Sequence, residues 1–313
     1  MKTQITDWLF VYNPIRKVID ENLNIKLKIF YFSLEMSKEQ KMLSAFSNIL
    51  YLKEGIRVAP SDLRSTKSSK ILSPEILKKI EEYKPYFEKI EELVTFIDNI
   101  RNPFGIYKIL REYAQANGTQ HKKEIEITDP KTGKTQKIEI DDYYQPNNPD
   151  EYVMIIIDHV GLITPENNTS LHQAITKLSS DYLILLRNKY NYIPVVIQQQ
   201  AASQESLEHA KANKLKPTLN GLGDCKLTQR DADLIMGLFS PFRHELPEYM
   251  GYDIKAFRDH IRFLEILGGR SGGGGTVAPL FFDGAVNFFK ELPKPDDITN
   301  MQKVYTSLKQ INN

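Results

Sequence analysis

The sequence predicts an α/β fold with a mainly parallel sheet and helices on both faces. Short apolar runs alternate along the chain with amphipathic segments of helical length, which is typical of this class. In addition, the apolar runs that begin at residues 30, 153 and 194 lead to an acidic residue or to glutamines, which are Glu35, Asp158 and the run from Gln198 to Gln200. Because parallel strands end at one edge of a sheet, these polar side chains are expected to lie together there.

The first half of the chain is predicted to be largely helical. Apolar spacing indicates an amphipathic helix over 3–24, interrupted at Asn13 and Pro14 because proline lacks a backbone donor. A buried strand is predicted over 26–32, followed by a helix over 37–51 that begins with the capping-box residues Ser37 and Gln40. The remaining elements are helices over 73–87, with 88–93 as a continuation, a strand over 94–98, and a helix over 103–117 that Gly118 ends.

The second half contains most of the predicted strands. Alternating isoleucine and charged residues indicate a two-stranded hairpin over 122–142 with its turn at 129–133, followed by a loop at 145–149. Strand 152–158, helix 170–190 and strand 193–198 are expected to form a right-handed β-α-β unit. A polar loop then covers 201–222. The last strands are predicted over 231–239, 261–267 and 279–282, with a glycine-rich link over 268–275.

The composition excludes several classes of protein. Lys and Arg number 41 against 40 Asp and Glu, so nucleic-acid binding would require a local basic patch. The single cysteine, Cys225, excludes an internal disulfide and a cysteine-rich zinc site. No apolar stretch has the length of a membrane span, and the first residues are not a secretory signal. We therefore expect a cytoplasmic protein with no membrane partner.

Several segments, taken in order, resemble the C-terminal motor domain of DnaB-type replicative helicases. They are 32–36 (FSLEM), 155–158 (IIID), 195–200 (VVIQQQ), 227–233 (LTQRDAD) and 269–277 (GRSGGGGTV). The resemblance implies a RecA-like fold over nearly the whole chain, 1–313, with the hairpin inserted at about 120–148. It also implies a phage or bacterial protein, located in the bacterial cytoplasm or in that of the phage's host.

The resemblance implies a role for each polar residue that matches a family motif. Glu35 would polarise the water that attacks the nucleotide, and Asp158 would orient the shell of a Mg²⁺ ion. Gln200 would sense the terminal phosphate, although the run of three glutamines leaves the register open by one residue. Arg270 would be an arginine finger that reaches the neighbouring subunit's nucleotide. Gly268 departs from the family, which usually has a lysine there.

Each of these residues also has an ordinary structural interpretation. Glu35 and Asp158 are also suited to capping the segments that follow them, and Gln200 to ending a strand as a simple polar residue. The alternative for Arg270 is a solvated loop residue. The resemblance also places Lys211, Lys214 and Lys216 in a loop that would contact single-stranded DNA phosphates. A solvated loop would carry the same lysines.

No complete Walker A phosphate loop is found. Such a loop needs a glycine-rich turn followed by Lys and Thr or Ser at a helix start. Segment 132–135 (TGKT) is rejected because Thr128 stands where an earlier glycine is needed and a strand follows. Lys2 and Thr3 match the end of the motif better, so they are the expected phosphate-binding residues, with Thr3 also a Mg²⁺ ligand.

This start of the chain leaves two interpretations. Either the sequence is cut inside its phosphate loop, or it is a degenerate homologue that has lost nucleotide binding. We favour the first, because the strand before the loop is central in RecA-like sheets, and its loss would leave backbone groups unpaired.

The function expected from the resemblance is an ATP-dependent replicative DNA helicase motor. It would use ATP and Mg²⁺, act as a homo-hexameric ring, and couple hydrolysis to translocation on single-stranded DNA and to duplex unwinding. A primase or a helicase loader would be a further partner. The alternatives are a RecA-like recombinase-type ATPase and a hydrolysis-dead interaction subunit of a replication complex.

Overall fold

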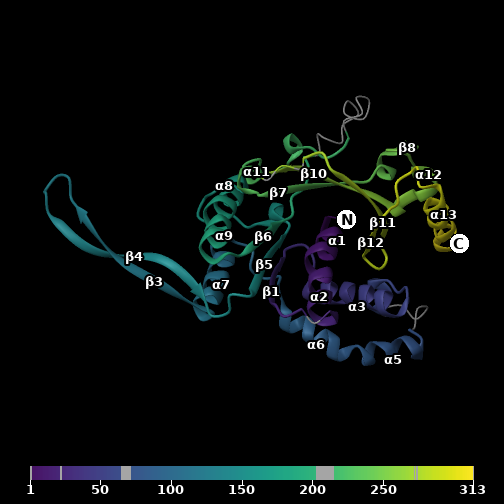
Figure 1. The fold of residues 1–313 in the computed structure, drawn as a ribbon, viewed down its shortest axis with the longest axis horizontal. Helices are drawn as coiled ribbons and strands as arrows, with labels where there is room; N and C mark the ends of the chain where they lie inside the picture. Colours follow the sequence, from purple (N-terminus) through teal and green to yellow (C-terminus); the bar gives the residue numbers. More distant parts are fainter. Residues whose placement is uncertain are drawn as a thin grey trace. The chain divides into compact units, whose positions relative to one another are not determined.

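The computed structural model describes residues 2–21, 23–64, 72–201, 215–270, 272 and 274–312. The chain divides into two compact units, and each is made of segments that are distant in the sequence. Unit 1 consists of Met1–Pro14, Met36–Glu91 and Ile197–Asn313, whereas unit 2 consists of Ile15–Glu35 and Glu92–Val196. Figure 1 labels most of the longer helices and strands of both units.

Unit 2 contains a four-stranded parallel sheet in the order β2-β1-β5-β6, of which Figure 1 labels β1, β5 and β6. Its strands are β1 (Lys26–Ser33), β2 (Val94–Ile97), β5 (Glu151–Asp158) and β6 (Ile193–Val196). The central strands β1 and β5 are buried along most of their length, as expected for a parallel sheet that is covered on its faces. The predicted parallel sheet and all four of its strands, predicted over 26–32, 94–98, 152–158 and 193–198, are therefore confirmed, with β6 ending two residues earlier than predicted.

Helices flank this sheet within unit 2. They are α7 (Pro103–Ala116), η2 (Val160–Leu162), α8 (Leu171–Thr176) and α9 (Ile184–Tyr190), and the π-helical segment η3 (Lys177–Leu183) joins α8 to α9. Ile106, Leu110 and Ala114 of α7 recur every fourth residue and are fully buried. The ring of Tyr113, also on α7, contacts that of Phe30 in β1, with 4.9 Å between centroids. The predicted helices at 103–117 and 170–190 are present, the second with an internal π-helical segment.

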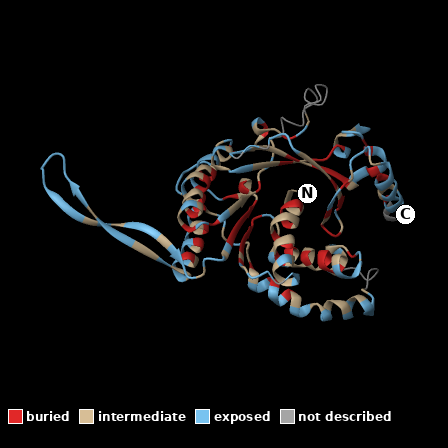
Figure 2. Cartoon of the chain, viewed as in Figure 1, coloured by how far each residue is buried: buried red, intermediate tan, exposed pale blue. Residues whose placement is uncertain are grey.

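The predicted hairpin is formed by β3 (Gly118–Thr128) and β4 (Thr135–Pro146). It is longer than the predicted 122–142, because pairing continues down to Gly118 and Pro146. Gly118 is required by a close approach, since a Cβ there would lie 2.6 Å from the backbone carbonyl oxygen of Gln145. Figure 1 shows the hairpin projecting from the rest of unit 2, and Figure 2 shows that most of it is exposed.

Unit 1 contains a four-stranded antiparallel sheet in the order β12-β11-β10-β7. Its strands are β7 (Leu234–Phe239), β10 (Ile261–Gly269), β11 (Val277–Asp283) and β12 (Phe288–Glu291). Strands were predicted near the first three, but neither β12 nor the antiparallel pairing was predicted. No long crossover helix separates these strands, and antiparallel neighbours need none. A small two-stranded sheet, β8 (Glu248–Tyr249) with β9 (Tyr252–Asp253), completes the strands of unit 1 that the described ranges contain.

The longer helices of unit 1 come from its N-terminal and middle segments. They are α1 (Lys2–Asp7), the π-helical turn η1 (Trp8–Tyr12), α3 (Lys38–Glu54), α5 (Pro74–Glu82) and α6 (Lys84–Leu93), the last of which ends in unit 2. Shorter helices and the C-terminal helix follow: α4 (Pro60–Leu63), η5 (Leu219–Gly221), α11 (Thr228–Asp231), η6 (Phe242–His244), α12 (Ile254–Phe257), η7 (Arg258–His260) and α13 (Ile298–Asn312). Within the described ranges, no helix is both long and apolar enough to span a membrane.

The predicted interruption at Asn13 and Pro14 is wrong. The backbone of Asn13 is helical, with φ −65° and ψ −47°, and α2 (Asn13–Asp20) continues directly from η1. Pro14 lies in the first turn of α2, where its missing donor costs little, and the π-helical turn precedes it. By contrast, the capping box predicted at Ser37 and Gln40 is confirmed, because both of its hydrogen bonds are present.

An aromatic cluster holds α1 and η1 against the antiparallel sheet. Ile5 packs with Leu280 and Phe282 of β11 and with Phe289 of β12. The indole of Trp8 meets the ring of Phe288 edge-on, with centroids 5.3 Å apart. This packing fixes the first helix of the chain, which carries the predicted phosphate-binding residues, within unit 1.

Candidate functional site

Glu35 and Asp158 lie at the same edge of the parallel sheet of unit 2. Ser33, the last residue of β1, is paired with Asp158, the last residue of β5. The backbone amide of Leu34 donates to the carbonyl of Asp158 at 2.8 Å, so pairing continues to the residue before Glu35. Glu35 is exposed, whereas Asp158 is 1 % exposed. The two strands therefore bring together the acids at the carboxyl edge of the sheet.

A buried phenol holds the carboxylate of Asp158. The hydroxyl of Tyr31 donates to Oδ2 of Asp158 at 2.9 Å, and Tyr31 itself is fully buried in β1. A buried carboxylate needs such a donor, because burial without one carries a large desolvation cost. The ring of Tyr31 is in turn packed against Phe96 of β2, with centroids 5.5 Å apart. This contact fixes the direction in which Tyr31 points.

Tyr31 was not among the residues predicted from the sequence to form the site. The signal was a hydroxyl-bearing ring within an otherwise apolar strand, two residues before the position that pairs with Asp158. Because side chains in a strand alternate between the two faces, the phenol and the carboxylate reach each other only if β1 and β5 are neighbours. That pairing is a property of the sheet order and cannot be read from β1 alone.

Lys2 and Thr3 are the first residues of α1 in unit 1. Both side chains are partly buried, and the helix that they open is packed onto β11 and β12. An ammonium and a hydroxyl in the first turn of a helix are the groups that phosphate loops use to bind phosphates and Mg²⁺. The structure thus agrees with the predicted helix start, and their function remains a proposal.

The glutamines after β6 differ in their surroundings, all within unit 1. Gln198 donates its amide to the carbonyls of Gly223 and Cys225, and it accepts a hydrogen bond from the hydroxyl of Thr228 at 2.7 Å. Gln198 therefore fastens the end of the apolar run to the segment that contains 223–228. These hydrogen bonds connect the motif at 195–200 to the start of the motif at 227–233.

Gln200 makes a different set of contacts. Its backbone forms an isolated antiparallel bridge with Leu222. Its side chain is partly buried, and the amide nitrogen has no hydrogen-bond partner in the part of the chain that the structure describes. The amide donor of Gln200 is therefore not committed to the described part of the fold, whereas that of Gln198 is.

Arg270 follows the last residue of β10 and connects two of the motifs found in the sequence. Its Nη1 is 2.9 Å from Oδ1 of Asp233, and its Nη2 is 3.3 Å from the carbonyl oxygen of Arg230. Both charged side chains are about half exposed, so the pair is accessible to solvent. Nearby, a Cβ added at Gly268 would meet Leu219 at 3.6 Å, an ordinary contact, so packing does not require glycine there.

Of the three lysines predicted to bind DNA, Lys211 and Lys214 lie outside the described residues. Lys216 is described, and its ammonium is 3.0 Å from the carboxylate of Glu265 in β10. This hydrogen bond and the charge of Glu265 raise the pKa of Lys216. An ammonium has three donors, so the ion pair leaves donors for other contacts.

No group of three or more metal-binding side chains was found among the residues that the structure describes. Mg²⁺ is commonly held in nucleotide sites by one or two carboxylates, with waters and phosphate oxygens as its other ligands. A single oriented carboxylate at a sheet edge, such as that of Asp158, fits an ion that arrives with its nucleotide. The residues present are therefore compatible with Mg²⁺ and ATP.

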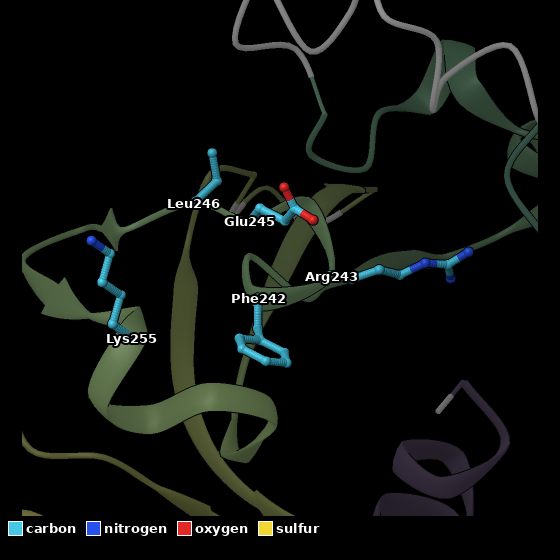
Figure 3. A pocket seen from close by; sticks show the side chains of 5 residues that line it. All are labelled: Phe242, Arg243, Glu245, Leu246 and Lys255. Atoms are coloured by element: carbon cyan, nitrogen blue, oxygen red, sulfur yellow. The ribbon is translucent and has the colours of Figure 1, made fainter.

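A pocket lies in unit 1 and is lined by none of the predicted site residues. It has a volume of about 510 Å³ and is lined by Phe242, Arg243, Glu245, Leu246 and Lys255 (Figure 3). None of these residues belongs to a motif found in the sequence. The pocket is open and carries both signs of charge, and we assign it no function.

No family model matches the chain, and no curated protein matches it. Solved structures do match. A DnaB-like replicative helicase, studied with its interactions with primase, aligns with a TM-score of 0.59 and 16 % identity over 88 % of this chain and 53 % of the other. A second solved structure, an ATPase domain, aligns with a TM-score of 0.56 and 17 % identity over 89 % of this chain and 78 % of the other.

These matches show that the chain has the RecA-like fold of helicase ATPase domains. The predicted fold class is thereby confirmed. The chain spans about half the length of the DnaB-like helicase that it matches.

Proposed function

We propose that this chain is the ATP-hydrolysing motor of a DnaB-type replicative DNA helicase. The observation that carries the proposal is the placement of an exposed Glu35 beside a buried, oriented Asp158 at the carboxyl edge of a parallel sheet. The fold in which they lie is the one found in helicase ATPase domains. Ligands of open α/β sheets bind at this edge.

The two acids are suited to different steps of phosphoryl transfer to water. Glu35 is exposed, so its carboxylate can accept a hydrogen bond from a water that attacks the terminal phosphate. Asp158 is held by Tyr31 and orients the waters around the Mg²⁺ that accompanies ATP. Bound Mg²⁺ would neutralise charge on the phosphates as it develops.

The remaining site residues complete the proposal. Lys2 and Thr3 bind the nucleotide phosphates, with Thr3 also a ligand of Mg²⁺, and Gln200 senses the terminal phosphate. Arg270 acts on the nucleotide of the adjacent subunit in a homo-hexameric ring. Lys216, together with Lys211 and Lys214, contacts single-stranded DNA phosphates. A primase or helicase loader is a further proposed partner.

The central test replaces Glu35 by Gln, which keeps the shape of the side chain and removes its charge. We expect the variant to bind ATP and to lose about 10²- to 10⁴-fold in the rate of single-stranded-DNA-stimulated hydrolysis. Glu88→Gln, at an exposed position of α6, is the matched control and should hydrolyse ATP at the wild-type rate. Wild-type hydrolysis by Glu35→Gln would refute the assignment.

A mixing experiment tests the role of Arg270 in a ring. Arg270→Ala and Glu35→Gln subunits should each be inactive alone. In mixed rings, an Arg270→Ala subunit keeps its own Glu35 and receives Arg270 from a Glu35→Gln neighbour, so part of the activity should return. If mixtures are never more active than the sum of the separate proteins, Arg270 does not act between subunits.

A hydrolysis-dead interaction subunit is the second candidate. It is favoured by Gly268 and by the internal ion pairs of Arg270 with Asp233 and of Lys216 with Glu265. In that case the charges needed for catalysis and DNA binding serve the fold instead. Calorimetric titration of this chain with Mg²⁺ and ATP distinguishes the two, because only the motor is expected to bind ATP.

A further inference from the structure

Arg270 lies in a glycine-rich part of the sequence. Two glycines precede it, and four of the five residues after it are glycines. Glycine has no side chain that could orient the arginine. Arginine is long and has many rotamers, so fixing it on a ligand costs conformational entropy unless it is already oriented. Any group that orients Arg270 must therefore come from a more distant part of the chain.

The backbone of Arg270 is held by the antiparallel sheet of unit 1. Its amide donates to the carbonyl of Asp233 at 3.0 Å, directly after the pair that Gly269 of β10 forms with Leu234 of β7. A Cβ at Gly269 would lie 3.2 Å from the same carbonyl oxygen, so the two segments approach closely there. The base of the arginine side chain is thus fixed, and the direction of the guanidinium depends on its own contacts.

One short segment, residues 230–233, supplies the contacts of this guanidinium. Nη1 is 2.9 Å from Oδ1 of Asp233, and Nη2 donates to the carbonyls of Arg230 at 3.3 Å and Asp231 at 3.5 Å. Both carbonyls belong to the end of α11, where carbonyls have no partner within the helix. A guanidinium has five N–H donors, so these contacts orient it and leave donors for a phosphate.

The segment that holds Arg270 is itself anchored in unit 1. The hydroxyl of Thr228, the first residue of α11, donates to the side-chain oxygen of Gln198 at 2.7 Å. The amide of Gln198 also donates to the carbonyl of Cys225 at 2.7 Å, three residues before α11. The start of α11 is therefore tied to the glutamine run, and its end is tied to Arg270.

The ion pair of Arg270 with Asp233 is exposed enough to orient the arginine without burying its charge. The two side chains are 53 % and 55 % exposed, and water screens an ion pair of this kind, so the attraction is weak. By contrast, Lys41 and Asp7 are 2 % and 5 % exposed and compensate each other's charge inside the fold. The positive charge of Arg270 is thus still available to an anion that arrives from solvent.

We propose that Asp233 is a positioning residue for Arg270 and that, together with the end of α11, it holds the guanidinium ready for the phosphates of the neighbouring subunit's nucleotide. This rests on the proposed function of Arg270 as an arginine finger. Orientation before contact lowers the entropy cost of placing a long side chain on its target. Loss of the Asp233 carboxylate should therefore slow hydrolysis and leave the binding of ATP unchanged.

Steady-state kinetics of Asp233→Ala in the full chain test this positioning. We expect kcat for hydrolysis of ATP, stimulated by single-stranded DNA, to fall about 10- to 100-fold, with KM for ATP and the thermal midpoint unchanged. Asp296→Ala, at an exposed position of the same unit, is the matched control and should keep the wild-type kcat. A wild-type or raised kcat in Asp233→Ala would overturn the proposal, and so would a loss that appears mainly in KM.

Mixed rings distinguish a failure of this proposal from a failure of the proposed function. Asp233→Ala subunits keep their own Glu35, so they should regain activity beside Glu35→Gln subunits, whose Arg270 is correctly held. Beside Arg270→Ala subunits they should gain nothing, because neither variant supplies a well-placed arginine. If Arg270→Ala complements Glu35→Gln but Asp233→Ala does not, Asp233 does not act through Arg270. If neither variant complements Glu35→Gln, the proposed role of Arg270 fails, and that of Asp233 fails with it.

Discussion

Lys41 of α3 donates hydrogen bonds to both carboxylate oxygens of Asp7, with each contact 3.1 Å long. Both side chains are buried, with 2 % and 5 % of their surface exposed. This ion pair joins α3 to the end of α1. The desolvation of such a pair is offset only while both partners are present.

Lys41→Met should therefore destabilise the protein strongly, because it leaves the Asp7 carboxylate buried without its partner. We expect the free energy of unfolding to fall by about 3–5 kcal/mol, measured by denaturant titration. The double variant Asp7→Leu with Lys41→Met should recover much of this loss. Lys38→Met removes a half-exposed ion pair with Glu91 and should cost no more than about 1 kcal/mol. Equal losses for Lys41→Met and Lys38→Met would contradict the prediction.

Stability should also fall in alkaline solution through Tyr12. Burial, together with the negative charge of Asp7, raises the pKa of Tyr12 well above its ordinary value. Above about pH 10 the phenol of Tyr12 loses its proton in the unfolded chain but keeps it in the folded chain. The contribution of Tyr12 to the free energy of unfolding is therefore constant below that pH and declines as the pH rises above it. The thermal midpoint of Tyr12→Phe should decline less steeply between about pH 9 and 11. Tyr143→Phe, at an exposed position, should follow the wild type.

The hydrogen bond from Tyr31 to Asp158 should affect the use of Mg²⁺. Tyr31→Phe keeps the ring and removes the hydroxyl that orients the carboxylate, so about 10- to 100-fold more Mg²⁺ should be needed for half-maximal hydrolysis. Tyr113→Phe is a matched control, because it removes a phenol that donates to Glu151 at the other end of β5. A similar Mg²⁺ requirement in both variants would mean that Tyr31 acts only through the fold.

Alanine substitutions of Gln198 and Gln200 should have different effects, the first on stability and the second on DNA-stimulated ATP hydrolysis. Gln198→Ala removes hydrogen bonds to Gly223, Cys225 and Thr228, so it should lower the free energy of unfolding by about 1–3 kcal/mol. Gln200→Ala should leave the thermal midpoint unchanged and abolish the stimulation of ATP hydrolysis by single-stranded DNA. If Gln198→Ala instead loses stimulation at an unchanged midpoint, the sensor is Gln198.

Local sequence patterns predicted the elements whose signals are local. The capping box at Ser37, the apolar runs of β1 and β5, and the alternating hairpin were all recognised and are present. The predicted position of Glu35 and Asp158 at one sheet edge followed from the rule that parallel strands share an edge, and the register agrees. These features need only the sequence of the element and one general rule.

Other features depend on partners that are far apart in the chain. Arg57 forms two hydrogen bonds with Asp283, and Lys216 pairs with Glu265. The sequence around Arg57 or Lys216 does not indicate which acidic residue each of them pairs with. The antiparallel order of β7, β10, β11 and β12 was missed for the same reason, since it depends on which strands become neighbours. The function of a lysine or an arginine in this chain is therefore decided by contacts that local patterns do not reveal.

The packing of Ile5 against Leu280, Phe282 and Phe289 has a consequence for the newly made chain. The ribosome synthesises Ile5 long before these partners, because Leu280, Phe282 and Phe289 lie far downstream in the sequence. Until then, the apolar side of the first helix has no native partner in this cluster. Unit 2, whose last residue is Val196, can complete its sheet earlier. Unit 2 can therefore fold during synthesis before α1 has its partners, and the apolar side of α1 is a surface that a chaperone would need to cover until then.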